Sequence, residues 1–199
     1  MRRILVFSWL LLILGVIAAF FWYNEWVYNL PTPVPKSYKA IAAGERIELK
    51  GISNDLSGKP LFLHFFNPDC PCSRFNIKHV RLLVKQYQSV ARFKLVLVSN
   101  KHYTEEQIQK RFDINIPVIP DKGLAAACGV YSTPQAVIVD AGQHLFYRGN
   151  YNRSRYCTDK NSNYAQQALE ALQKKNYTTQ FAPLAVKAYG CSLPGCAVN

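Results

Sequence analysis

The 199-residue sequence has no charged residue between Ile4 and Tyr23, no cysteine before Cys70 and no internal repeat or low-complexity block. A cleavable signal peptide has a shorter apolar core with a small-residue cleavage site directly behind it, whereas aromatic residues follow this run. The A-x-A pattern at residues 40–42 lies too far downstream to serve as that site. The lack of an early cysteine argues against a lipid-modified N-terminus. These absences favour an uncleaved anchor.

The apolar run from Ile4 to Tyr23 predicts a transmembrane helix. As a helix it is roughly 30 Å long, which is enough to cross the hydrocarbon core of a bilayer. Arg2 and Arg3 precede it, and positive flanks resist translocation. We therefore expect contact with the lipid bilayer through residues 4–23 and a single pass through a bacterial inner membrane. The N-terminus would be cytoplasmic and the C-terminal domain periplasmic.

The composition, 49% hydrophobic and 18% charged, is typical of a folded globule with an apolar attachment. The net charge of +12 is spread along the chain rather than clustered. Scattered basic residues on an exported domain indicate a solvated cationic surface near anionic lipid, so we expect no nucleic-acid partner. In an exported domain the six cysteines can be oxidised and remain so.

Apolar periodicity predicts an α/β fold with a central sheet and helices on both faces. The expected strands are residues 45–50, 61–66, 93–99, 135–140 and 144–149, and the expected helices are residues 70–87, 104–112, 123–130 and 162–175. The predicted organisation is a cytoplasmic start and anchor at 1–28, a proline-rich linker at 29–39, a folded domain at 40–176 and a cysteine-containing tail at 177–199. Prolines at every second position of the linker favour a semi-rigid spacer that lifts the domain off the membrane.

Cys70 and Cys72 stand between a buried-strand pattern and a helix pattern, in the stretch NPDCPCS. Pro71 favours the first position of the helix, which makes Cys70 the N-cap residue. Unpaired backbone N–H groups and the positive end of the helix dipole then point at Cys70. A thiolate is stabilised there, which is how a nucleophile for thiol–disulfide exchange is made.

The stretch FLHFFNPDCPCSRF resembles the strand–loop–helix opening that carries the redox cysteines of the thioredoxin superfamily. VIPDKGLAAACGVYSTPQAVIVDAGQHLFYRG is similar to the segment around the cis-proline of membrane-anchored TlpA/ResA-type thiol–disulfide oxidoreductases, and the resemblance spans about residues 40 to 175. It implies a thioredoxin-like fold with a central mixed sheet flanked by helices, and Cys70 as the nucleophile. It also implies a cis Thr133–Pro134 bond that faces the thiols and docks an extended substrate. The implied partners are an exported client protein with a disulfide or thiols, and a membrane redox donor or acceptor.

Three positions depart from the family pattern. Ser73 stands where the second cysteine is expected, so either Cys70 and Cys72 form a labile couple or another thiol resolves Cys70. Asp69 replaces the usual aromatic residue, and its charge would raise the pKa of the neighbouring thiol. His64 takes the position of a buried acid, where it either exchanges protons with the second thiol or is a hydrogen-bonded core histidine.

The remaining cysteines divide into two groups. Cys128, in a small-residue helix, is expected to be a buried apolar residue. Cys157 lies in a polar loop and is a candidate resolving thiol. Cys191 and Cys196 flank the turn sequence SLPG, so a local structural disulfide is the leading interpretation for this pair. The alternative is a mobile tail that shuttles electrons to Cys70.

Two other functions remain open alongside the oxidoreductase, which itself needs no cofactor and no metal. A C-x-C pair supplies two soft thiolates suited to Cu(I), so a copper-binding or metal-delivery module is one alternative. Sco-type copper proteins, however, carry CxxxC and a histidine on the loop before the hairpin, and STPQAVIVD has none. A thiol peroxidase is the other alternative, although a Thr-x-x-Cys pattern is missing.

Overall fold

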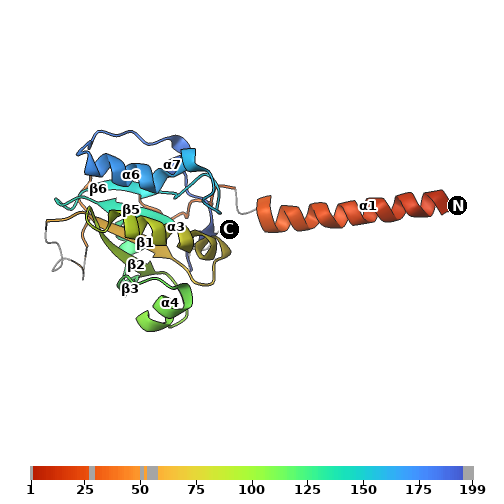
Figure 1. The fold of residues 1–199 in the computed structure, drawn as a ribbon, viewed down its shortest axis with the longest axis horizontal. Coiled ribbons are helices and arrows are strands. Elements are labelled where there is room, and N and C mark those ends of the chain that lie inside the picture. The colour runs from red at the N-terminus through yellow and green to blue at the C-terminus, as the bar shows by residue number, and fades with distance from the viewer. Residues whose placement is uncertain (1, 27–29, 50–51, 53–57, 195–199) are drawn as a thin grey trace.

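The computed structural model describes residues 2–26, 30–49, 52 and 58–194 (Figure 1). Along the chain the helices are α1 Arg2–Phe21, η1 Trp22–Trp26, α3 Pro71–Tyr87, α4 Glu105–Phe112, α5 Leu124–Ala127, η3 Lys160–Ser162, α6 Tyr164–Gln173 and α7 Pro183–Val186. The strands are β1 Leu61–Phe66, β2 Arg92–Leu97, β3 Val118–Pro120, β4 Ser132–Thr133, β5 Gln135–Val139, β6 Leu145–Gly149 and β7 Cys191–Ser192.

Five strands form a mixed sheet in the order β3-β2-β1-β5-β6. β1 and β2 run parallel, with Leu61 opposite Arg92, while β1 and β5 run antiparallel, with Leu61 opposite Val139. β1 is therefore the central strand, and the chain that leaves its C-terminal end enters α3. The expected α/β architecture with a central mixed sheet is confirmed.

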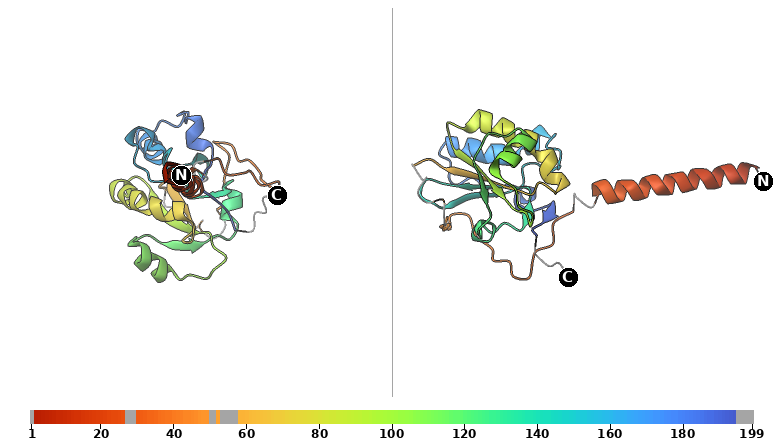
Figure 2. Two further views of the ribbon diagram at one scale, coloured as in Figure 1. Left: turned by 90° about the vertical axis from the view of Figure 1, so that its right-hand side faces the viewer. Right: turned by 90° about the horizontal axis from the view of Figure 1, so that it is seen from below.

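Both faces of the sheet are buried, as the mainly apolar sequence of β1 predicts. Phe62 and Phe66 belong to the core cluster on the face that α3, α4 and α6 cover. The two turned views show these helices on one side of the sheet (Figure 2). Leu63 and Phe65 point to the opposite face, where they pack against α5 and the segment around Ile47. The larger helices thus lie on one face, and the second face is closed mainly by extended chain.

α3 and α4 begin at the residues that local helix-capping signals indicate. Cys70 is the N-cap of α3 in extended conformation and Pro71 is its first residue, as predicted. Thr104 caps α4: its hydroxyl accepts a hydrogen bond from the backbone N–H of Gln107, and the Gln107 side chain accepts one from the Thr104 backbone N–H. This capping box satisfies two donors that the helix itself leaves unpaired.

The predicted secondary structure differs from the structure in several places. The edge strand β3 was not predicted, and the helix expected at residues 123–130 is only Leu124–Ala127. The strand expected at residues 45–50 is reduced to a single bridge between Arg46 and His144, and residue 50 lies outside the described residues. The described part of the tail, for which no helix or strand was predicted, forms α7 and β7. The tail packs back onto the domain, and Ala185 is buried beside β6.

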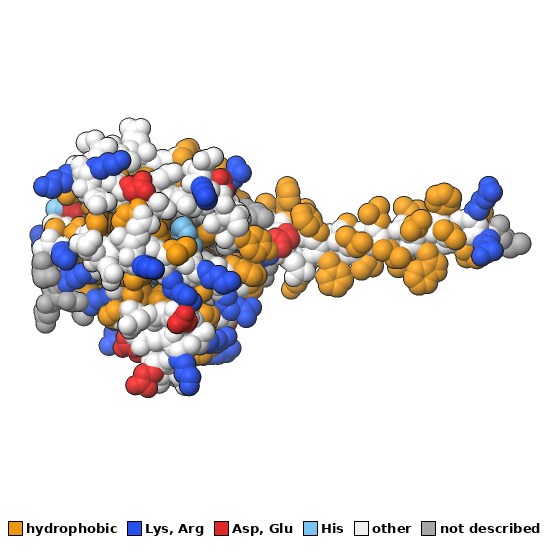
Figure 3. All heavy atoms as spheres, in the orientation of Figure 1, with side chains coloured by type: hydrophobic (Ala, Val, Ile, Leu, Met, Phe, Trp, Pro, Cys, Tyr) orange, Lys and Arg blue, Asp and Glu red, His pale blue; other side chains and the backbone are white. Residues whose placement is uncertain are grey.

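α1 projects away from the domain, with apolar side chains along its length and basic ones at its N-terminal end (Figures 1 and 3). The helix from Arg2 to Trp26 is long and apolar enough to cross a membrane, and none of its most apolar stretch is buried in the protein. The linker differs from the predicted spacer. Pro31 pairs with Tyr189, and Thr32 is buried, with its backbone N–H donating to the carbonyl of Ala188. The chain therefore returns to the domain directly behind the apolar helix.

Candidate redox site

A disulfide joins Cys70, at the N-terminus of α3, to Cys191 in β7, with the two Cα atoms 6.2 Å apart. The leading expectation for Cys191, a local disulfide with Cys196, is wrong for this state, because Cys191 is already bonded. Cys196 itself lies outside the described residues. A tail that reaches Cys70, which the sequence left as the alternative, is the arrangement present. Position 191 thus supplies the partner thiol that the motif lacks at Ser73.

Cys72 is the third sulfur of the site. Its Sγ and those of Cys70 and Cys191 all lie within 4.8 Å of one another. Cys72 is fully buried, and Cys70 is 2% exposed. Three thiolates at this spacing are a donor set for a soft cation such as Cu(I), once the Cys70–Cys191 bond has been reduced.

Arg155 supplies positive charge at Cys72. Burial raises the pKa of the Cys72 thiol, and the charge of Arg155 and a hydrogen bond from it oppose that rise. The guanidinium is itself 5% exposed, lies 5.2 Å from the ring centre of Phe75 and donates from Nη2 to Oε1 of Glu25 at 2.8 Å. Tyr156 donates to the same carboxylate oxygen at 2.6 Å. A residue at the end of the apolar helix is thereby linked to the site.

The Thr133–Pro134 bond is cis, as the resemblance implied, and the carbonyl oxygen of Thr133 lies 3.6 Å from Sγ of Cys70. β4 pairs antiparallel with β7, with Thr133 opposite Cys191. The hydroxyl of Ser132 lies 2.8 Å from that of Thr32 and donates to the carbonyl of Tyr189 at 3.1 Å. The tail therefore lies on the proline loop as an added strand.

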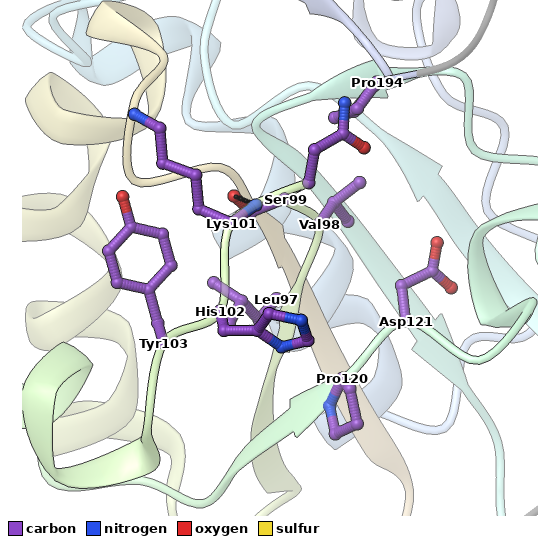
Figure 4. A pocket seen from close by; sticks show the side chains of 10 residues that line it. Leu97, Val98, Ser99, Lys101, His102, Tyr103, Pro120, Asp121 and Pro194 are labelled. Atoms are coloured by element: carbon purple, nitrogen blue, oxygen red, sulfur yellow. Dashed lines mark hydrogen bonds between the residues drawn. The ribbon is translucent and has the colours of Figure 1, made fainter.

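Side chains from the segment that precedes α4 contact the loop before Cys70. Burial favours a higher pKa for Asp69, but hydrogen bonds from Lys101 and Tyr103 and the nearby positive charges outweigh it, so its pKa is lowered. Lys101 and Tyr103 also line a cavity of about 370 Å³ that reaches Pro194, three residues beyond Cys191 (Figure 4). Lys101 thus offsets the charge that Asp69 brings beside Cys70.

His64 is completely buried in β1. Its Nδ1 lies 2.7 Å from the hydroxyl of Tyr151, and its ring contacts that of Phe66. Desolvation lowers the pKa of His64 to about 3, so the imidazole is neutral at physiological pH. These contacts match the core-histidine interpretation, and proton exchange with a thiol stays a prediction.

The other described cysteines lie apart from the three sulfurs. Cys157 packs beside α3, where the side-chain amide of Asn76 donates to its sulfur at 3.2 Å, and burial raises its pKa to about 11. Cys128 is fully buried behind the sheet, and burial raises its pKa to about 12. The expectation of a buried apolar Cys128 is confirmed. In the oxidised state Cys191, rather than Cys157, is the partner of Cys70.

Sequence reasoning did not find Arg155, Ser132 or Thr32. No local motif marks them, because each reaches the site only through the tertiary fold. A weak signal existed for Cys191: Gly190 precedes it, and a glycine in an otherwise irregular tail permits close approach of two backbones. Its φ is +122°, and a Cβ there would meet the carbonyl oxygen of Thr133.

The mixed sheet, the cis-proline loop and the cysteine at the start of α3 together make a thioredoxin-like fold. Solved structures agree on the fold. An uncharacterized conserved protein from Geobacillus kaustophilus matches with a TM-score of 0.66 and 17% identity, over 82% of this chain and 97% of that one. Peroxidoxin BcpB from Mycobacterium tuberculosis matches with a TM-score of 0.53 and 17% identity, over 68% of this chain and 98% of that one.

Within that class the chain belongs to the family described as Domain of unknown function (DUF6436), whose model matches residues 41–194. It is also similar to the thiol-disulfide oxidoreductase ResA of Halalkalibacterium halodurans, with 27% identity over 100 residues. That match covers 49% of this chain and 54% of the relative, so the chain spans about half the length of this curated relative.

Proposed function

We propose that this protein is a membrane-anchored thiol–disulfide oxidoreductase that acts on protein thiols or disulfides on the periplasmic side of a bacterial inner membrane. The observation that carries the proposal is the Cys70–Cys191 disulfide at the N-terminus of α3, beside the Thr133–Pro134 loop. A helix N-terminus stabilises the Cys70 thiolate, and a thiolate is the attacking species in disulfide exchange. The similarity to ResA supports the same chemistry.

In the reduced protein the Cys70 thiolate attacks one sulfur of a client disulfide and forms a mixed disulfide, and the second client sulfur leaves as a thiolate. The Cys191 thiolate then attacks Sγ of Cys70, which re-forms the Cys70–Cys191 bond and releases the client as a dithiol. The client gains two electrons and the cysteine pair loses two. The reverse sequence oxidises a client dithiol, and a membrane redox partner would reset the pair in either direction.

The client would lie where β7 now lies. β7 contacts the proline loop through an antiparallel pairing with β4, and an extended polypeptide can make the same backbone hydrogen bonds. Thr133 would then position the client chain, while Pro134 keeps that loop from donating a competing backbone N–H. We therefore expect clients that present a cysteine in an extended segment.

Trapping tests the proposal. In full-length Cys191→Ser the resolving thiol is gone, so mixed disulfides on Cys70 should accumulate and appear as slow bands on non-reducing gels. Cys128→Ser is the matched control, because that thiol is buried behind the sheet, and it should trap nothing above the wild-type level. Adducts should vanish in the double variant Cys70→Ser with Cys191→Ser. The proposal fails if Cys191→Ser forms no adduct and the purified wild-type chain does not exchange with glutathione.

The cluster of three sulfurs favours a second candidate function, the binding of Cu(I). Fully reduced protein would offer Cys70, Cys72 and Cys191 as ligands. Titration of the reduced chain with Cu(I) should then give stoichiometric binding that is lost in Cys72→Ser. A titration that shows no stoichiometric binding would exclude this function without affecting the oxidoreductase proposal.

A further inference from the structure

We infer that Cys72 is an internal exchange thiol, which attacks Sγ of Cys191 in the oxidised protein and moves the disulfide from Cys70 to itself. The inference rests on the proposed function, because it describes how the same site would present Cys70 to a client. The Cys72–Cys191 bond forms, the Cys70–Cys191 bond breaks, and Cys70 leaves as a thiolate. One disulfide replaces another, so no oxidant or reductant is consumed, and the proton of Cys72 passes to water.

Position limits what Cys72 can react with. Its sulfur lies within 4.8 Å of both sulfurs of the disulfide, whereas the side chain is fully buried under the first turn of α3. A protein client cannot reach a thiol that has no exposed surface. The Cys70–Cys191 bond, in contrast, is already beside it, and an exchange requires only a small movement of β7 or of the Cys72 side chain.

Cys191 is the better target of the two sulfurs. Attack on Cys191 releases Cys70, whose thiolate lies at the positive end of the 17-residue helix α3. A thiol with a lowered pKa leaves faster in disulfide exchange. Attack on Cys70 would instead join residues two positions apart, whose side chains point in different directions at the start of a helix.

Arg155 lowers the free-energy cost of deprotonating Cys72, so the attacking thiolate forms more readily. The buried guanidinium donates a hydrogen bond to Cys72 and opposes the rise in its pKa that burial causes.

The test uses the full-length oxidised chain in detergent, incubated and sampled over time. Acid quenching stops exchange, a maleimide labels the free thiols in acidic denaturant, and peptide mapping identifies the labelled cysteine. We expect label on both Cys70 and Cys72, because the disulfide exchanges between them. Label confined to Cys72 would overturn the inference, and so would release of Cys191, which would indicate a Cys70–Cys72 bond.

Three variants and one control sharpen the test. Cys72→Ser should keep Cys70 unlabelled, and oxidised Cys70→Ser should contain a Cys72–Cys191 disulfide. Arg155→Met should slow the appearance of label on Cys70, whereas the control Arg153→Met, which removes an exposed ion pair with Asp159, should not. If Cys72 and Cys191 are both free in Cys70→Ser, the inference fails. A failure of client trapping leaves these outcomes unchanged, so the two proposals fail separately.

Discussion

His64 is neutral because the fold removes it from water. The imidazole sits under α3 in the central strand, and desolvation holds its pKa at about 3, against about 6.5 for an exposed histidine. The unfolded chain therefore binds a proton at His64 between these two values while the folded chain does not. Stability that is present above pH 6.5 is accordingly lost as the pH falls toward 3.

We predict that His64→Gln makes the protein less sensitive to acid. Glutamine does not titrate and can still reach the hydroxyl of Tyr151, so the linkage to pH disappears. Between pH 7 and pH 4.5 the wild type should lose about 2 to 3 kcal/mol more unfolding free energy than the variant. Urea unfolding of both chains at the two pH values measures this. An equal loss in both chains would show that His64 does not contribute to acid sensitivity.

Local sequence signals explain most of the secondary structure. Pro71 after a potential N-cap and Thr104 three residues before Gln107 are short-range patterns, and each marks the start of a helix correctly. The same reasoning could not place β7, because a two-residue strand has no periodicity and exists only through its pairing with β4. The Cys70–Cys191 bond spans a sequence separation of 121, so its pairing depends on the completed fold. Proximity to Cys196 was a poor guide for that reason.

β7 depends on the backbone of Gly190. Its φ of +122° is one that residues with a side chain rarely adopt, and a Cβ would meet the carbonyl oxygen of Thr133. We predict that Gly190→Ala displaces β7 from β4 and weakens the Cys70–Cys191 bond. Backbone strain of about 1–3 kcal/mol corresponds to a drop of about 5-fold to 150-fold in the equilibrium constant for disulfide formation. Equilibration with glutathione buffers and thiol mapping measure that constant.

Gly44→Ala is the matched control for that experiment. Gly44 also has a positive φ, +85°, but a Cβ there would meet nothing within 4 Å. The control therefore carries the conformational strain without the collision at Thr133. Equal effects of the two substitutions would mean that the contact between Gly190 and Thr133 does not hold the tail in place.

The apolar helix contacts the folded domain at the candidate redox site. Glu25 contacts Arg155, and Thr32 lies on the segment that precedes Cys191, so the chain leaving the helix is bound on the side where the disulfide lies. A spacer of the predicted kind would have held the site away from the helix. The contact between Glu25 and Arg155 instead holds the three-sulfur site near the end of the apolar helix, so we expect clients at or near the bilayer surface.

We predict that the full chain stays in the membrane fraction after an alkaline carbonate wash, with an intact N-terminus by mass spectrometry. Leu11→Lys together with Leu14→Lys should release it, because each charge at the centre of a spanning helix costs about 2.5–3.5 kcal/mol. Tyr23→Lys adds a charge at the end of the same helix, where a lysine can extend to the interface, and should stay bound. A soluble chain that lacks its first residues would identify a cleaved signal instead.

β7 also makes the tail a tethered competitor of every client. A strand connected to its own binding surface experiences an effective concentration on the order of millimolar, far above that of a dilute free protein. A polypeptide that only competes for the same backbone hydrogen bonds would seldom displace β7. A client would bind the proline loop only after it breaks the Cys70–Cys191 bond chemically. The tail would therefore make an otherwise sequence-tolerant docking edge select clients by their chemical reactivity.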